Sequence, residues 1–147
     1  MKLNIDIEKK FNLKNIRLNL SKELNDAGRI IRSDHFKRLE RGMGANGRPL
    51  KNLADSTIAS KGFDQILVNT GKMRNLVIKK ATAQKQVVEL NPGTKQRRGK
   101  VTNQEIRYYH QNGLGVPKRE WFGITKEAEK KSIKAIELKI NRVLRNA

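Results

Sequence analysis

The sequence predicts a single α+β domain in which two long helices pack on one face of a small antiparallel sheet. Three observations predict this class. Apolar residues recur every three or four positions in one long segment near the start and another at the end. Short runs of alternating or β-branched residues lie outside these segments and are typical of strands. The length of 147 residues suits one domain spanning residues 1–147.

The first part of the chain is expected to form a strand and then the first long helix. Residues 2–7 alternate apolar and polar side chains, so Leu3, Ile5 and Ile7 would share one face of a strand. Residues 12–41 are expected to form one helix, with an apolar stripe that includes Ile16, Leu20, Leu24, Ala27 and Ile31. The helix should end at Gly42 and Gly44, because glycine readily adopts the left-handed conformation that closes a helix.

A loop over residues 42–53 and a short helix from about Asp55 to Lys61 are expected next. Thr70 is a candidate N-cap for a tight turn with Gly71. Two strands should follow, over Leu76–Ile78 and Val87–Leu90, because both runs are apolar and the residues between them are polar.

The last third is expected to contain a loop, a short helix and the second long helix. Residues 93–103 carry four cations and one apolar residue, so they are interpreted as an exposed, mobile loop. A short helix is expected over residues 106–111, closed by Gly113. Trp121 and Phe122 should form a short buried strand or anchor. Thr125 is expected to cap a final helix that runs to about Leu144.

The strongest bulk property is charge. The chain has 33 Lys and Arg against 14 Asp and Glu, for a net charge of +19. Such a field favours polyanion partners, of which nucleic acid is one. The best local candidates for contact with phosphates, or with a neighbouring subunit, are the cations of the 93–103 loop, namely Lys95, Arg97, Arg98 and Lys100.

Several function classes lack the residues that they need. There is no cysteine, and the two histidines, His35 and His110, have no ligand-spaced partners, so no metal site is expected. Residues 42–47 match G-x-G-x-x-G, but a helix precedes them and Pro49 follows, so no dinucleotide cofactor is expected. No catalytic motif is present. We expect neither a signal peptide nor a membrane span, because no apolar run is long enough.

Four segments of the chain, in this order and spacing, resemble the phage virion morphogenesis family, which includes the Mu-type tail-completion proteins. The first is Leu53-Ala54-Asp55-Ser56-Thr57-Ile58-Ala59-Ser60-Lys61, and the second is Leu67-Val68-Asn69-Thr70-Gly71-Lys72-Met73-Arg74-Asn75. The third is His110-Gln111-Asn112-Gly113. The fourth is Pro117-Lys118-Arg119-Glu120-Trp121-Phe122-Gly123.

The resemblance implies a structural protein with no catalytic residues and no cofactor. It implies a homo-oligomeric ring, with about six subunits as the expected number, since head-to-tail contacts can close into a ring. The ring would lie at the head-proximal end of the tail or the neck of the virion, after assembly in the host cytoplasm, with other tail and neck proteins as partners. DNA would pass through it, which gives the positive charge a purpose. The residues that the resemblance marks as assembly or fold motifs are Thr70, Gly71, His110, Gln111, Gly113, Pro117, Arg119 and Trp121.

Two other readings of the residues stay open. A cellular nucleic-acid-binding module would use the basic loop and bind DNA or RNA with strong salt dependence. A hydrolase built around His110 and Arg119 would lose its activity when His110 is replaced, but no metal ligands accompany these residues. Arg119 itself could bond backbone carbonyls or a carboxylate, within its own subunit or in a neighbouring one.

Overall fold

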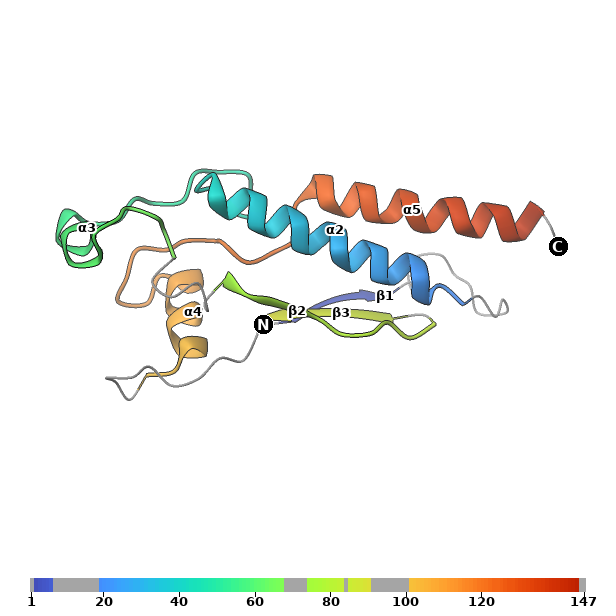
Figure 1. Ribbon diagram of the computed structural model, residues 1–147, viewed down its shortest axis with the longest axis horizontal. Coiled ribbons are helices and arrows are strands. Elements are labelled where there is room, and N and C mark those ends of the chain that lie inside the picture. The colour runs from blue at the N-terminus through green and yellow to red at the C-terminus, as the bar shows by residue number, and fades with distance from the viewer. Residues whose placement is uncertain (1, 7–18, 68–73, 84, 91–100, 146–147) are drawn as a thin grey trace. The chain divides into compact units, whose positions relative to one another are not determined.

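The structure is a computed structural model that describes residues 2–6, 19–67, 74–83, 85–90 and 101–145. Its elements are β1 (Lys2–Asp6), α2 (Ser21–Glu40), α3 (Asp55–Lys61), β2 (Leu76–Ile78), β3 (Lys85–Leu90), α4 (Asn103–Asn112) and α5 (Lys126–Arg145) (Figure 1). The class is α+β, as the sequence predicts. No helix in the described ranges is long and apolar enough to cross a membrane.

The chain divides into two compact units, each made of segments that are distant in the sequence. Unit 1 contains residues 1–34, 76–89 and 124–147, and unit 2 contains residues 35–75 and 90–123. Helix α2 contributes its first part to unit 1 and its last turns to unit 2. Neither unit corresponds to one continuous stretch of chain. The expectation of a single domain over 1–147 stays a prediction.

Unit 1 consists of the sheet and the two long helices. The strand order is β1-β3-β2. Strands β1 and β3 run antiparallel with Leu3 opposite Val88 and Ile5 opposite Gln86. Only a short connection joins β2 to β3, which an antiparallel pair allows and a parallel pair does not. The described part of the first strand ends at Asp6, so the predicted Ile7 lies outside the described residues.

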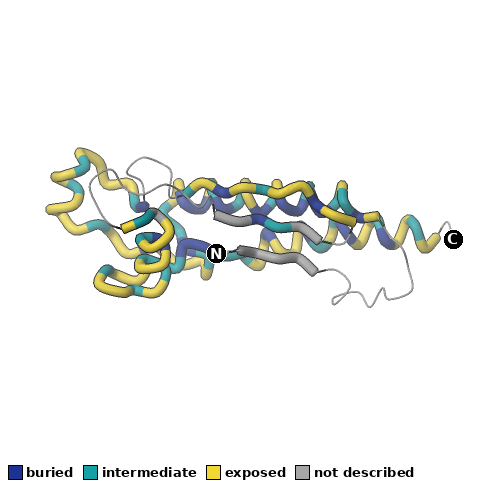
Figure 2. Tube along the Cα trace, turned by 90° about the horizontal axis from the view of Figure 1, so that it is seen from below, coloured by how far each residue is buried: buried dark blue, intermediate teal, exposed yellow. Residues whose placement is uncertain are grey.

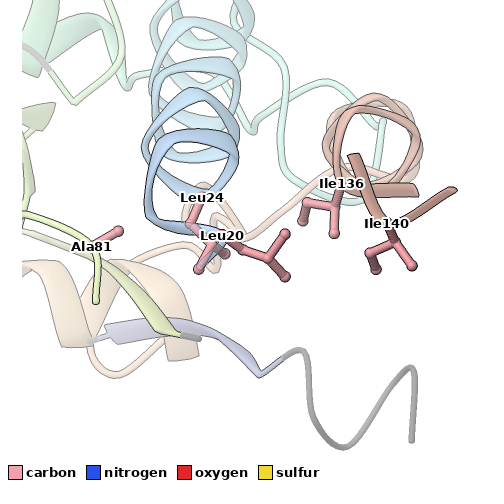
Figure 3. Close-up of a cluster of buried hydrophobic side chains, with 5 residues drawn as sticks. All are labelled: Leu20, Leu24, Ala81, Ile136 and Ile140. Carbon is pink, nitrogen blue, oxygen red and sulfur yellow. The ribbon is translucent and has the colours of Figure 1, made fainter. Parts of the chain in front are cut away.

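The two long helices of unit 1 pack on each other through aliphatic side chains. Leu20 and Leu24 meet Ile136 and Ile140 of α5, and Ala81 completes the cluster (Figure 3). All five are less than 9% exposed, and burial of this kind contributes about 1.5–3 kcal/mol for each leucine or isoleucine. The apolar spacing predicted for the last long segment is therefore confirmed at Ala128, Ile136 and Ile140, which are all buried, and Figure 2 shows the buried and exposed sides of α5.

Two side-chain caps fix where these helices begin. Thr125 accepts a hydrogen bond from the Ala128 amide at 3.1 Å and donates to the Asp34 carboxylate at 3.1 Å, so it caps α5 as expected and ties it to α2. Helix α2 begins at Ser21, so residues 19 and 20 are not helical as predicted, and residues 12–18 of the predicted helix, with Ile16, lie outside the described residues. Asn19 accepts from the Ser21 amide at 3.1 Å, and the Leu20 amide bonds the Ala83 carbonyl at 2.9 Å instead of an intrahelical partner.

Candidate functional site

Helix α4 positions the third of the four sequence segments, and both of its ends are capped. At its start, Thr102 and Glu105 form a reciprocal capping box. At its end, Gly113 has a φ of 77°, and a Cβ added there would lie 2.9 Å from the Lys118 Cβ. The helix thus begins at Asn103, three residues earlier than predicted, because the capping hydroxyl at Thr102 supplies a start signal. His110 and Gln111 lie in its last turn.

Gln111 holds the backbone of the Trp121–Phe122 segment. Its Oε1 accepts from the amides of Trp121 and Phe122, both at 3.1 Å, and its Nε2 donates to the Phe122 carbonyl at 3.1 Å. One side-chain amide therefore replaces the partners that a neighbouring strand would provide. Trp121 and Phe122 are anchored as buried side chains, 0% and 6% exposed, without forming a strand.

Arg119 is the second link between segments. The side chain is 4% exposed. Its Nε donates to the Lys51 carbonyl at 2.8 Å, and its Nη2 donates to the Asn52 carbonyl at 2.9 Å. Its Nη1 lies 3.1 Å from His110 Nδ1. The guanidinium thus bonds carbonyls within its own chain, and no carboxylate of the described residues pairs with it. We call Arg119, His110 and Gln111 with these backbone partners the Arg119 cluster.

The glycine-rich loop after α2 joins the same unit through its backbone. Met43 pairs with Pro49 in an isolated antiparallel bridge, and the Ala45 amide donates to the Glu120 carbonyl at 2.7 Å. A Cβ at Gly44 would lie 2.9 Å from that carbonyl oxygen, so the close approach requires glycine. This loop follows a helix and turns back on itself, which is not the strand-loop-helix geometry of a dinucleotide site.

His35 and Arg38, in the second half of α2, both contact Trp121. The Arg38 guanidinium donates to the carbonyls of Met43 at 3.2 Å and Trp121 at 3.0 Å. His35 Nδ1 lies 3.3 Å from Arg38 Nη2, and its Nε2 lies 3.2 Å from the Arg74 carbonyl. A neutral imidazole protonated on Nε2 satisfies both contacts, since the guanidinium needs an acceptor and the carbonyl needs a donor.

Both histidines thus serve as neutral acceptors for arginines. Burial, and secondly the charge of Arg38, lowers the pKa of His35 to about 4. Burial also lowers the pKa of His110, and the neighbouring Arg119 charge lowers it further. In both rings Nδ1 faces an arginine nitrogen, which leaves it unsuited to bind a metal. The described residues contain no group of three His, Cys, Asp or Glu side chains that could hold a metal ion.

A pH dependence of stability follows from His35. Its folded-state pKa of about 4 lies below the unfolded value of 6.5, so the neutral ring stabilises the fold above pH 6.5 and this stability is lost as the pH falls towards 4. At pH 5 the loss is about 2 kcal/mol relative to pH 7.5. Urea unfolding at several pH values should show this slope, and His35→Gln should flatten it. An unchanged slope in the His35→Gln variant would contradict the assignment. His110→Gln removes the other histidine whose pKa burial lowers, so the two variants together show how much of the slope each ring contributes.

Unit 2 also contains a cleft of about 370 Å³. Three carboxylates, from Glu40, Asp55 and Asp64, lie around it together with Arg41. Its apolar lining comes from Leu39, Leu53, Ile58 and Ile66. Asn52, which lines the cleft beside Leu53, is itself held through its carbonyl by Arg119, so the Arg119 cluster fixes one side of the cleft. We call it the acidic cleft.

The predicted site residues divide into two sets. The Arg119 cluster brings together Arg119, His110, Gln111 and the backbone of Trp121, while Pro117 is exposed and its carbonyl lies 3.5 Å from Arg119 Nη1. Thr70 and Gly71 lie outside the described residues, as do the loop cations Lys95, Arg97, Arg98 and Lys100. Sequence reasoning missed Arg38 and the acidic cleft. The Thr102-x-x-Glu105 pattern was a readable signal for the start of α4.

Comparison with known proteins adds no relative. The chain matches no family model, no curated protein and no solved structure.

Proposed function

We propose that this chain is a structural, non-enzymatic virion assembly protein of a tailed phage, which forms a ring at the head-proximal end of the tail or in the neck and completes the tail for joining to the head. The ring is built from copies of this chain and contacts other tail or neck proteins. DNA passes through it with weak, sequence-independent contacts.

The observation that carries this proposal is the meeting, in unit 2, of the third and fourth family-like segments with the residues that lead into the first. Arg119 of the fourth segment bonds His110 of the third segment and the two carbonyls that precede Leu53, where the first segment begins. Gln111 of the third segment bonds the backbone of Trp121 and Phe122 in the fourth. Residues that are spaced like the family's motifs thus act on one another, which supports a shared framework over a chance match of separate motifs.

The charge and the loop composition support the same role. At +19, the chain repels other basic surfaces and attracts DNA, which suits a lumen that DNA crosses. Contacts to phosphates from lysine and arginine carry no sequence information, so passing DNA would be neutralised without being held at one sequence.

Absolute mass in solution, measured by light scattering over a concentration series at two salt concentrations, tests the proposal. A closed oligomer, or growth of the mass towards about six subunits, is the expected result. Electron micrographs of the same sample should then show rings. A chain that remains monomeric and that also fails to join purified tails to heads would contradict the proposal.

A nucleic-acid-binding module is the second candidate, favoured by the net charge alone. It differs in the strength of binding. A monomer that binds DNA tightly, with an affinity that falls about linearly with salt on logarithmic axes, would favour this candidate over the ring.

A further inference from the structure

The acidic cleft is unusual for a chain with an excess of positive charge. Glu40, Asp55 and Asp64 are exposed at its edge, and none of them forms an ion pair within the described residues. The cleft lining thus carries three carboxylates against one cation, Arg41, around its apolar residues, and the nearby Lys61 ammonium also acts on Asp64. Charged residues placed around an apolar depression are typical of a rim that selects an oppositely charged partner.

Helix α5 carries a surface that matches the cleft in both respects. Leu138 is 63% exposed, the most exposed large apolar side chain in the described part of the chain. Lys134 lies four residues before it, and Arg142 and Arg145 lie four and seven residues after it. Residues at this spacing share one face of a helix. We call these four residues the α5 stripe, and its three cations form no ion pair within the described residues.

We propose that the acidic cleft of one copy binds the α5 stripe of a second copy. Leu138 enters the apolar floor, and Lys134, Arg142 and Arg145 face the three carboxylates. The inference rests on the proposed self-assembly and deepens it, because it names the two surfaces that meet. Each copy uses one surface from each unit, so the contact is head-to-tail and leaves a free cleft and a free stripe at the ends until the assembly closes.

Other exposed apolar side chains match the cleft less well. Phe63 is covered by the Lys61 ammonium, which lies 4.6 Å from the centre of its ring. Leu114 is 50% exposed, but the nearby Lys118 is already paired with Glu120. Leu144 is 52% exposed and lies six residues beyond Leu138, which places it on another face of α5. Leu138 alone is bracketed by unpaired cations one turn before and one turn after.

Charge reversal on either surface tests the contact. The cleft variant carries Asp55→Lys and Asp64→Lys, and the helix variant carries Arg142→Glu and Arg145→Glu. Each should weaken self-association at least about tenfold in light scattering, because like charges would then face each other. Asp26→Lys is a control with a single charge reversal away from both surfaces, since the half-exposed Asp26 pairs with Arg29 at the surface. It should leave the association unchanged.

An uncharged substitution separates the apolar contact from general electrostatics. Leu138→Ser should weaken association without any change in net charge. Leu144→Ser removes a leucine of similar exposure from another face of the same helix, so it should have little effect. Equal effects of the two substitutions would overturn the assignment of Leu138 to the cleft. Circular dichroism should confirm that each variant keeps its helices.

Mixing the two charge variants gives the most direct result. The cleft variant keeps an intact α5 stripe, and the helix variant keeps an intact cleft. Each variant alone should associate at least about tenfold more weakly than the wild type. In the mixture the unchanged cleft meets the unchanged stripe and the reversed cleft meets the reversed stripe, so the mixture should assemble with the two variants alternating. A chain that carries all four substitutions should recover assembly, since the charges are then exchanged across the contact.

The outcomes distinguish this inference from the proposed function. Wild-type chains that assemble, together with variants that assemble equally well, would overturn the inference and leave the ring proposal standing. A wild-type chain that is monomeric at all concentrations would overturn the inference, and the ring proposal would then depend on the joining of tails to heads. A mixture of the two charge variants that stays monomeric would also overturn it.

Discussion

Replacing Arg119 with alanine is expected to lower the free energy of unfolding by about 2–4 kcal/mol, because the change removes a buried side chain that makes three part-buried hydrogen bonds. The carbonyls of Lys51 and Asn52 and the Nδ1 of His110 would lose their partner, and a hydrogen bond to a charged group contributes about 1.5–3 kcal/mol where it is well buried and less where water can reach it. Trp121 is the only tryptophan and lies in the same unit, so its fluorescence during urea unfolding reports this loss.

Two comparisons sharpen the Arg119 experiment. Arg119→Lys should recover less than half of the loss, because a single ammonium cannot reach both carbonyls and the imidazole in the geometry of the guanidinium. Lys118→Ala removes a neighbouring cation that forms an exposed pair with Glu120, and it should cost less than about 1 kcal/mol. A value for Arg119→Ala near that of Lys118→Ala would show that the cluster does not stabilise unit 2.

Replacing Trp121 with alanine is expected to cost about 3–5 kcal/mol through the cavity that it leaves. The side chain is 0% exposed and lies beside His35 and Phe122, with ring centroids at 5.9 Å and 6.1 Å. Loss of this anchor should also release the segment that Gln111 holds. Thermal unfolding followed by circular dichroism measures the change, and self-association should weaken with it because the acidic cleft belongs to the same unit.

Trp121→Phe is the informative partner of that change. The indole Nε1 is buried and has no hydrogen-bond partner among the described residues. Removing this nitrogen therefore breaks no hydrogen bond within the described part of the chain. Trp121→Phe should lower the free energy of unfolding by roughly half as much as Trp121→Ala, or less. Leu114→Ala, at an exposed leucine of unit 2, should change stability by less than about 0.5 kcal/mol. If Trp121→Phe lowered the free energy of unfolding as much as Trp121→Ala, the indole nitrogen would have to make a stabilising contact, which would contradict this expectation.

Local sequence patterns predicted the elements well because their causes are local. The stripe of α5 and its cap at Thr125 depend on residues within a few turns. The prediction that Leu20 is helical was wrong, because Leu20 fits the periodic stripe and is buried although its amide bonds Ala83 and not a helical partner. Burial alone does not distinguish a helical residue from the residue that precedes the helix.

The candidate site was harder to predict because its partners are distant in the sequence. Arg119 was expected to bond carbonyls or a carboxylate, but nothing in the sequence indicated Lys51 and Asn52, which lie more than 60 residues away. No sequence pattern singled out Arg38, because its bond to the Trp121 carbonyl joins residues 83 positions apart. The acidic cleft collects residues from α2, α3 and the segments around α3, so only the three-dimensional structure reveals it.

The pairing of β1 with β3 has a consequence for how the chain acquires its structure. Asp6 pairs with Lys85, so the first strand leaves the ribosome about 80 residues before its partner does. At roughly 5–20 residues per second, β1 waits about 4–16 s with its edges unpaired. Contacts of such long sequence separation slow folding, because the chain loses loop-closure entropy before the strands form their favourable hydrogen bonds and side-chain contacts. A nascent chain of this protein is therefore exposed to misassociation early, and unit 1 can form only once the C-terminal helix has been made.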